Sequence, residues 1–119
     1  MIATIDRRAI RRICLALKGA TLDHPWDRTH DAYKIGGKMF AVIGSKGGLS
    51  FKASEIAFAV LTETGKAQPA RYMARGHWVQ LDDWEKWPED ELRDYLEAAY
   101  ELVVAKLTKA ARKELGLTP

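Results

Sequence analysis

Basic side chains recur in the middle of the chain at positions suited to phosphate contacts. Six of them lie in or beside segments that alternate like strands: Lys34, Lys38, Lys46, Lys52, Arg71 and Arg75. Three aromatic residues lie near them in the sequence: Trp26, Tyr72 and Trp78. Lys and Arg contact phosphate oxygens, and aromatic rings beside them can stack on bases. This set indicates a nucleic-acid-binding surface, and the alternative is a solvated charged face with Trp78 in the core.

Other reactive side chains do not form a recognisable catalytic or metal-binding pattern. The spacing of Cys14, His24, His30 and His77 matches no zinc motif, and no two histidines are four residues apart on a helix. Cys14 falls on an apolar helical stripe, which predicts a buried, unreactive thiol. We therefore expect no metal, no cofactor and no catalytic residues.

Two further segments have ordinary structural explanations. The run Gly44-Ser45-Lys46-Gly47-Gly48 lacks the Gly-Lys-Ser/Thr ending of a phosphate-binding loop and leads into a strand, so we expect a hairpin turn. Residues 77–101 hold nine acidic residues against Lys86 and Arg93. Clustered carboxylates can bind a cation, but acids at the start of a helix more often complement its dipole.

The lysines are positioned by a predicted three-stranded unit over residues 31–53. Gly36-Gly37 suits a two-residue hairpin turn, which would pair Ile35 with Lys38 and Tyr33 with Phe40. One face would then hold Tyr33, Ile35, Phe40 and Val42, and the other Lys34, Met39, Ala41 and Ile43. In the third strand Leu49 and Phe51 alternate with Ser50 and Lys52. Lys34 and Lys52 should therefore lie on the face opposite the core.

Helical periodicity marks the elements that would cover the other face of this sheet. We expect a helix over residues 5–17 capped by Thr4, and a helix over 54–64 capped by Ser54 that buries Ile56, Ala57, Val60 and Leu61. A long helix follows Pro88, and a short final helix is capped by Thr108. The apolar stripe of the long helix is Leu92, Leu96, Ala99, Val103 and Leu107. Residues 20–24 and 77–82 read as strands, and 68–70 as a turn. This order predicts an α+β fold, with an antiparallel sheet and helices packed on one face.

The composition fits one domain over residues 1–119. The chain is 47% hydrophobic and 29% charged, its net charge is +3 and its pI is about 9.1. This charge permits a nucleic-acid partner without requiring one. One cysteine means no disulfide framework, and no apolar run reaches the ~20 residues needed to span a bilayer. We expect a cytoplasmic protein that does not bind membranes, with a monomer favoured.

Several segments together resemble the MmcQ/YjbR family. They are CLALKGATLDHPW (14–26), YKIGGKMFAVI (33–43), LSFKA (49–53), YMARGHWV (72–79) and YELVVAKL (100–107). The match runs in order over nearly the whole chain. The resemblance implies a small cytoplasmic bacterial protein with a frataxin-like (CyaY-like) fold. It also implies a double-wing DNA-binding surface built from β-hairpins, and it transfers no catalytic residues.

Three functional hypotheses follow. The first is a non-enzymatic DNA-binding protein of low sequence specificity that uses the six basic residues. The second is a protein-interaction module that docks through the acidic helix start and the N-terminal arginines. The third is a small-molecule-binding or resistance-associated protein with an aromatic pocket of Trp26, Tyr33, Tyr72 and Trp78. A continuous basic patch would favour the first, and a concave aromatic pocket the third.

Overall fold

The glycine pair at 36–37 makes the tight turn on which the sheet is built. In the computed structural model, which describes residues 6–71 and 76–117, Gly36 and Gly37 have φ of 60° and 79°. Two successive positive φ values are typical of a type I′ turn, whose twist matches that of the two paired strands. A Cβ on Gly36 would lie 2.8 Å from a Leu107 methyl, so this glycine also allows close packing.

The sheet has six antiparallel strands in the order β1-β2-β3-β4-β6-β5. Their bounds are Thr21–Asp23 (β1), Asp31–Ile35 (β2), Lys38–Ile43 (β3), Leu49–Lys52 (β4), Gln68–Pro69 (β5) and Trp78–Leu81 (β6). The predicted strands are present, and β1 forms one edge of the sheet. Residues 68–69, which we expected in a turn, instead form the other edge strand because they pair with Val79 and Gln80.

A bulge at Phe40 changes the predicted faces of β3. Ile35 pairs with Lys38 as predicted, but Tyr33 pairs with Ala41 instead of Phe40. Phe40 and Ala41 therefore both enter the core, and Ile43 joins them. Val42 turns to the opposite side, beside Ala32 and Trp78. The prediction that Val42 faces the core and that Ala41 and Ile43 face away is wrong, because an inserted residue reverses the alternation beyond it.

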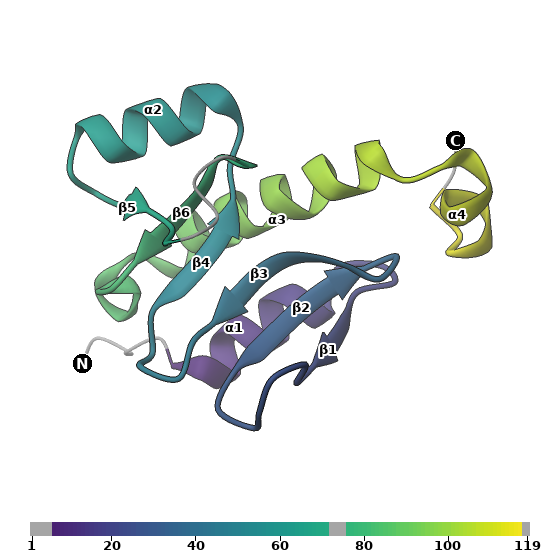
Figure 1. Cartoon of the computed structure of the whole chain (residues 1–119), viewed down its shortest axis with the longest axis horizontal. Coiled ribbons are helices and arrows are strands. Elements are labelled where there is room, and N and C mark those ends of the chain that lie inside the picture. The colour runs from purple at the N-terminus through teal and green to yellow at the C-terminus, as the bar shows by residue number, and fades with distance from the viewer. Residues whose placement is uncertain (1–5, 72–75, 118–119) are drawn as a thin grey trace.

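The helices and the core lie together on one side of the sheet. Figure 1 shows α1 (Arg7–Leu15) and α3 (Glu89–Lys106) behind the strands, with α2 (Glu55–Glu63) beyond β5 and β6. A short 3-10 helix, η2 (Trp84–Lys86), precedes α3, and α4 (Lys109–Glu114) follows it. The predicted stripe of α3 is buried from Leu92 to Leu107. The α+β fold with an antiparallel sheet is confirmed.

Two details of the helices differ from the predictions. Asp6 caps α1 by accepting a 3.0 Å bond from the Ala9 amide, whereas the predicted cap, Thr4, lies outside the described residues. Ser54 caps α2 as predicted, but Ile56 is 77% exposed and Val60 50% exposed. The prediction that both are buried is wrong, since α2 packs through Ala57, Phe58 and Leu61 instead. None of the described helices is long and apolar enough to cross a membrane.

Candidate functional site

The sheet side opposite the core, here called the open face, carries a thin apolar cluster flanked by lysines. The cluster consists of Ala32, Val42, Ala70 and Trp78, with Met39 packed against it. Lys34 pairs across the sheet with Met39, and Lys52 pairs with Trp78, so both lysines belong to this face. They stand on the strands that flank β3, about 10 Å apart at the backbone for two strand spacings. The predicted placement of Lys34 and Lys52 opposite the core agrees with the observed register.

Lys34 and Lys52 are each held by a group of the protein. The Lys34 ammonium lies 2.7 Å from the Asp23 carboxylate, and its hydrogen bond holds the pKa of Asp23 below its usual value. Lys52 Nζ donates to the Gly76 carbonyl at 3.2 Å. Partial burial, and secondly the charge of Lys106, lower the pKa of Lys52. Both cations are fixed in position, and the charge of Lys34 is largely balanced.

Lys38 and Lys46 are the exposed cations of this region. Lys38 follows the glycine turn, and Lys46 lies in the β3–β4 turn. Neither forms an ion pair with another described residue. They stand at opposite ends of β3, roughly 20 Å apart at ~3.4 Å per residue. The four predicted lysines therefore do not form one compact cluster. Lys34, Lys46 and Lys52 belong to the open face, whereas Lys38 pairs with Ile35 of the core and leaves the sheet on the other side.

The remaining residues predicted to contact nucleic acid differ in their exposure, and two of them lie outside the described residues. Arg71 is exposed next to Ala70, whose amide donates to the Trp78 carbonyl at 2.9 Å. Arg75 and Tyr72 lie outside the described residues. Trp78 is only 8% exposed, whereas Trp26 is 60% exposed on the β1–β2 loop.

The predicted aromatic pocket does not take the shape that was expected. Tyr33 belongs to the core cluster and Trp78 to the open-face cluster, so these two rings lie on opposite sides of the sheet. Tyr33 is fully buried, and burial raises its pKa to about 12. Trp26 contacts His30 in the loop instead, with ring centroids 5.4 Å apart.

Several charges on the helical side of the molecule pair with one another. Arg12 lies 2.8 Å from Glu89, which also lies 2.9 Å from Arg93. Arg7 lies 3.2 Å from the buried carboxylate of Asp31. Arg7, Arg8 and Arg12, which we considered as docking groups, thus pair with acids of the same chain. The acids of α3 lie on the side away from the open face.

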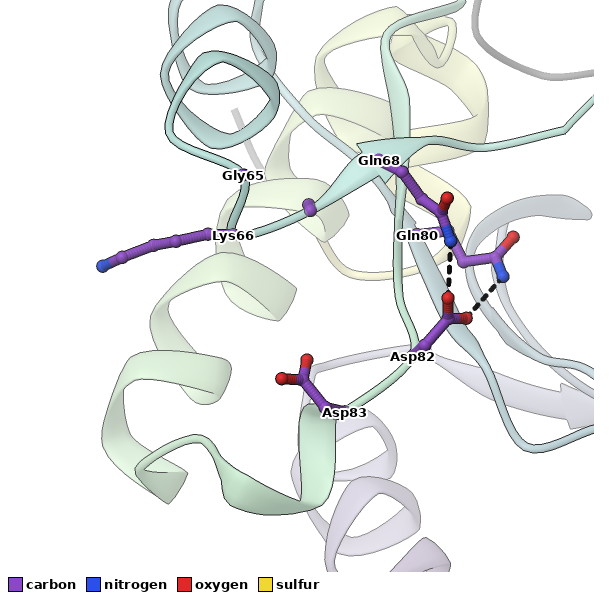
Figure 2. Close-up of a pocket in the computed structure, with 7 residues that line it drawn as sticks. Gly65, Lys66, Gln68, Gln80, Asp82 and Asp83 are labelled. Carbon is purple, nitrogen blue, oxygen red and sulfur yellow. Dashed lines mark hydrogen bonds between the residues drawn. The ribbon is translucent and has the colours of Figure 1, made fainter.

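A polar cavity of about 210 Å³ lies between the α2–β5 turn and the end of β6. Figure 2 shows Asp82 joining the two strands: Gln68 donates to one carboxylate oxygen, and Gln80 donates to the other at 2.8 Å. Lys66 points away from these groups, and its nearest acid is Glu91 at 3.8 Å. Asp82 therefore links β5 to β6 through side-chain hydrogen bonds, which is a structural role.

Two other cavities border β4. One, of about 350 Å³, lies between β4, the start of α2 and α3, and its lining includes Phe51, Tyr95 and Leu102. Lys52 also borders it, together with Asp94 and Glu101 of α3. The other, of about 230 Å³, lies on the open face between His30 and the turn that carries Lys46. Sequence reasoning missed this second cavity, because its walls come from two turns that are distant in the chain.

The described residues contain no group of three or more His, Cys, Asp or Glu side chains that could hold a metal ion. His24 and His30 share the β1–β2 loop, where His24 Nδ1 lies 2.9 Å from the His30 carbonyl oxygen. Cys14 is fully buried as predicted, and burial raises its pKa to about 12. The thiol is therefore protonated and shielded at neutral pH.

A family model, a known protein and a solved structure are similar to this chain. The family model described as YjbR matches residues 15–102, which is most of the chain. The chain belongs to the YjbR family. The YjbR match includes every strand and α2, together with most of α3. The family expectation from the sequence motifs is confirmed.

Two relatives agree with this assignment. The chain is 28% identical over 109 residues to the "Uncharacterized protein YbdF" of Escherichia coli O157:H7, covering 88% of this chain and 89% of that protein. The crystal structure of Deinococcus radiodurans protein DR2400, with the family-model domain DUF419, is similar with a TM-score of 0.79 and 28% identity. That likeness covers 92% of this chain and 86% of the other. The YjbR-like fold is therefore established over nearly the whole chain.

Proposed function

We propose that this YjbR-family chain is a non-enzymatic protein that binds DNA through the open face with low sequence specificity. The observation that carries the proposal is the group of lysines on this face, where Lys34 and Lys52 flank β3 and exposed Lys46 borders the face at the β3–β4 turn. Exposed Lys38 stands at the other end of β3, where its pairing with Ile35 sets it on the core side of the sheet. The family resemblance, with its double-wing surface, supports it. Arg71, and Arg75 beyond the described residues, would extend the contacts.

The geometry favours phosphate contacts over base reading. Lys38 and Lys46 are separated by roughly 20 Å, which corresponds to about six base pairs at ~3.4 Å per pair along one strand. Lys34 and Lys52 occupy the interval between them, in fixed positions. Side chains spaced in this way can follow a backbone, and contacts of this kind orient a protein on nucleic acid without selecting its sequence.

The exposed lysines should contribute more to DNA affinity than the two fixed ones. Lys34 would have to share its charge with Asp23, and Lys52 would have to leave the Gly76 carbonyl. Reversing either charge would also disturb the fold, because Lys34→Glu would face Asp23 directly. Lys38 and Lys46 can be neutralised without removing an ion pair, so they are the better probes.

Fluorescence anisotropy with two unrelated duplexes over a range of salt concentrations tests the proposal. The double variant Lys38→Gln/Lys46→Gln should weaken binding equally on both duplexes. Each lost phosphate contact should also reduce the salt slope by about 0.9. The matched control is Arg8→Gln/Arg12→Gln, which removes the same charge from α1 on the helical side. These arginines make only exposed ion pairs with Asp6 and Glu89.

Three outcomes can be separated. A larger loss in the lysine variant than in the arginine control supports binding at the two ends of β3, and the single variant Lys46→Gln then tests the open face itself. A larger loss in the arginine control would move the binding surface to the helical side. If the wild-type chain binds neither duplex at low salt, binding of duplex DNA is excluded.

A protein-interaction role is the second candidate, and the exposed side of α2 is the observation that favours it. Ile56 and Val60 are four residues apart on one side of the helix and together present an apolar strip to solvent. The protein-interaction role would be favoured if the chain binds no duplex.

A further inference from the structure

The loop between β1 and β2 presents an aromatic ring to solvent in a fixed setting. Trp26 is 60% exposed, although tryptophan is usually well buried in folded proteins. Its ring meets the His30 ring at an interplanar angle of 69°, in an edge-on contact. One side of Trp26 is thus supported by the protein and much of the rest remains accessible.

Hydrogen bonds hold this loop in one conformation. The Asp27 carboxylate accepts bonds from the Thr29 amide at 2.8 Å, from the Thr29 hydroxyl, and from His30 Nδ1 at 2.9 Å. The bonds from the Thr29 hydroxyl, then from His30, hold the pKa of Asp27 well below its usual value, so the carboxylate stays ionised at neutral pH. A ring that is positioned before binding loses less conformational entropy when a ligand stacks on it.

The cavity of about 230 Å³ lies directly beside this loop. His30 forms one wall, Ser45 and Lys46 of the β3–β4 turn form another, and Val42, Ser50 and Gln80 contribute from the strands. Figure 1 shows the loop and the turn together at the lower edge of the sheet. Trp84 donates from its indole nitrogen to the Gly47 carbonyl and so anchors the turn from the core side.

The groups around the cavity suit the parts of a nucleotide. The Lys46 ammonium is an exposed donor for a phosphate, and the two serine hydroxyls can bond to sugar or phosphate oxygens. Gln80 donates its amide to Asp82, and Figure 2 shows its carbonyl oxygen directed away from that carboxylate. The cavity is smaller than those that enclose drug-sized ligands, which favours a single sugar–phosphate unit.

We propose that Trp26 and this cavity form a site for one unpaired nucleotide of a single strand. The base stacks on the exposed face of Trp26, and the sugar and phosphate lie in the cavity beside Lys46. This assignment rests on the proposed nucleic-acid function and adds that unpaired segments bind more tightly than intact duplex. A duplex offers phosphates to Lys46, but its bases are stacked inside and cannot reach Trp26.

The test compares a labelled single strand of about 12 nucleotides, within the usual range for one binding domain, with a duplex of the same sequence. Trp26→Ala should weaken single-strand binding by roughly 5- to 100-fold, as expected when one base loses its aromatic partner. It should leave duplex binding unchanged. Trp26→Phe keeps a flat ring and should retain most of the single-strand affinity. Ile56→Ala is the matched control, since it removes an exposed apolar side chain on α2 and should change neither affinity.

A free mononucleotide is the second arm, because it could supply the same base and phosphate. It lacks the flanking phosphates that the other lysines would contact, so we expect it to bind at least about tenfold more weakly than the strand. Equal affinity would overturn the assignment to a strand.

The remaining outcomes separate this inference from the proposed function. If Trp26→Ala weakens single strand and duplex equally, or weakens neither, the stacking site is excluded while DNA binding stands. If the wild-type duplex affinity exceeds the single-strand affinity, the preference for unpaired segments is excluded. If neither nucleic acid binds the wild-type chain, both proposals fail together.

Discussion

The bulge at Phe40 can be tested by placing the same Val-to-Thr change on neighbouring residues of β3. Val42 lies on the open face and borders the cavity beside Lys46, whereas Ile43 is fully buried in the core. Without the bulge, the two residues would exchange sides. The variants to compare are Val42→Thr at one position, and Ile43→Val and Ile43→Thr at the other.

The expected costs follow from what surrounds each hydroxyl. Ile43→Val should cost about 0.5–1.5 kcal/mol for one buried methylene. Going from valine to threonine at 43 should cost a further ~1–3 kcal/mol, since the hydroxyl enters an apolar core. Val42→Thr should cost less than ~1 kcal/mol, because its hydroxyl can face the cavity and bond to water.

Urea unfolding of the four proteins measures these differences. With an m-value of about 1.5 kcal/mol/M, the Val-to-Thr step at 43 should lower the midpoint by roughly 0.7–2 M, against less than ~0.7 M at 42. An equal m-value in all four proteins would show that only stability has changed. A larger loss for Val42→Thr than for the step at 43 would refute the bulge and restore the uninterrupted register.

Four further outcomes can be measured on the same scale. Phe40→Ala should cost ~3–5 kcal/mol in urea unfolding, because Phe40 is fully buried edge-on to Tyr100 and the tyrosine is held in place by its bond to the Lys18 carbonyl. A loss below ~2 kcal/mol would mean that the site collapses or that Phe40 is not in the core. Replacing Ile56 and Val60 by serine should change stability by no more than ~0.5 kcal/mol each, and a loss of several kcal/mol would show that they are covered in solution. The Cys14 pKa rises from 9.0 to about 12 on folding, so its contribution to stability is complete below pH 9 and is lost between pH 9 and 12. Between pH 8 and 10.5 the wild type should therefore lose ~2 kcal/mol more than Cys14→Ala, and parallel curves would contradict the buried thiol. Exhaustive chelation should leave the melting temperature unchanged, and a clear drop would revive a metal-binding role for the histidines or the acidic segment.

The features that the sequence predicted correctly are those with a local cause. Gly36-Gly37 predicts its hairpin because both positions need positive φ, and the adjacent pairing of Ile35 with Lys38 follows from the turn. Ser54 and Thr108 each cap the helix that follows, because the side-chain oxygen meets the amide three residues ahead.

The errors arise where neighbouring residues are chemically alike. Residues 39–43 are all apolar, so alternation gives no signal for the inserted residue at Phe40. In α2, Ile56 and Val60 match the helical period as well as Ala57 and Leu61 do. The choice between the two sides depends on tertiary packing, including the contact of Phe58 with the His77 ring at 5.5 Å. The hydrogen bond of Trp84 could not be predicted from the sequence either, because its partner, Gly47, lies 37 residues away.

The partners of the charged side chains, which bear on function, also could not be predicted from the sequence. Strand alternation alone places Lys34 and Lys52 on the open face, and the register agrees. Alternation cannot show that Asp23 comes from the edge strand to neutralise one, or that the Gly76 carbonyl comes from another loop to engage the other. Of the exposed lysines, Lys46 is in a turn, where no periodicity operates, and Lys38 begins β3, where its pairing with Ile35 sets it on the core side.

The distribution of paired and unpaired charge also determines how a polyanion can approach. The acids of α3 are on the helical side, and only some of them are balanced there by Arg12, Arg93 and Lys66. A strand of phosphates nearing that side meets surplus carboxylates, whereas the open face offers Lys46, which has no paired acid among the described residues. A chain with a net charge of only +3 can therefore attract nucleic acid to one face and repel it from the other. If both proposals hold, Lys46 contributes to both duplex and single-strand binding, and Trp26 alone separates the two.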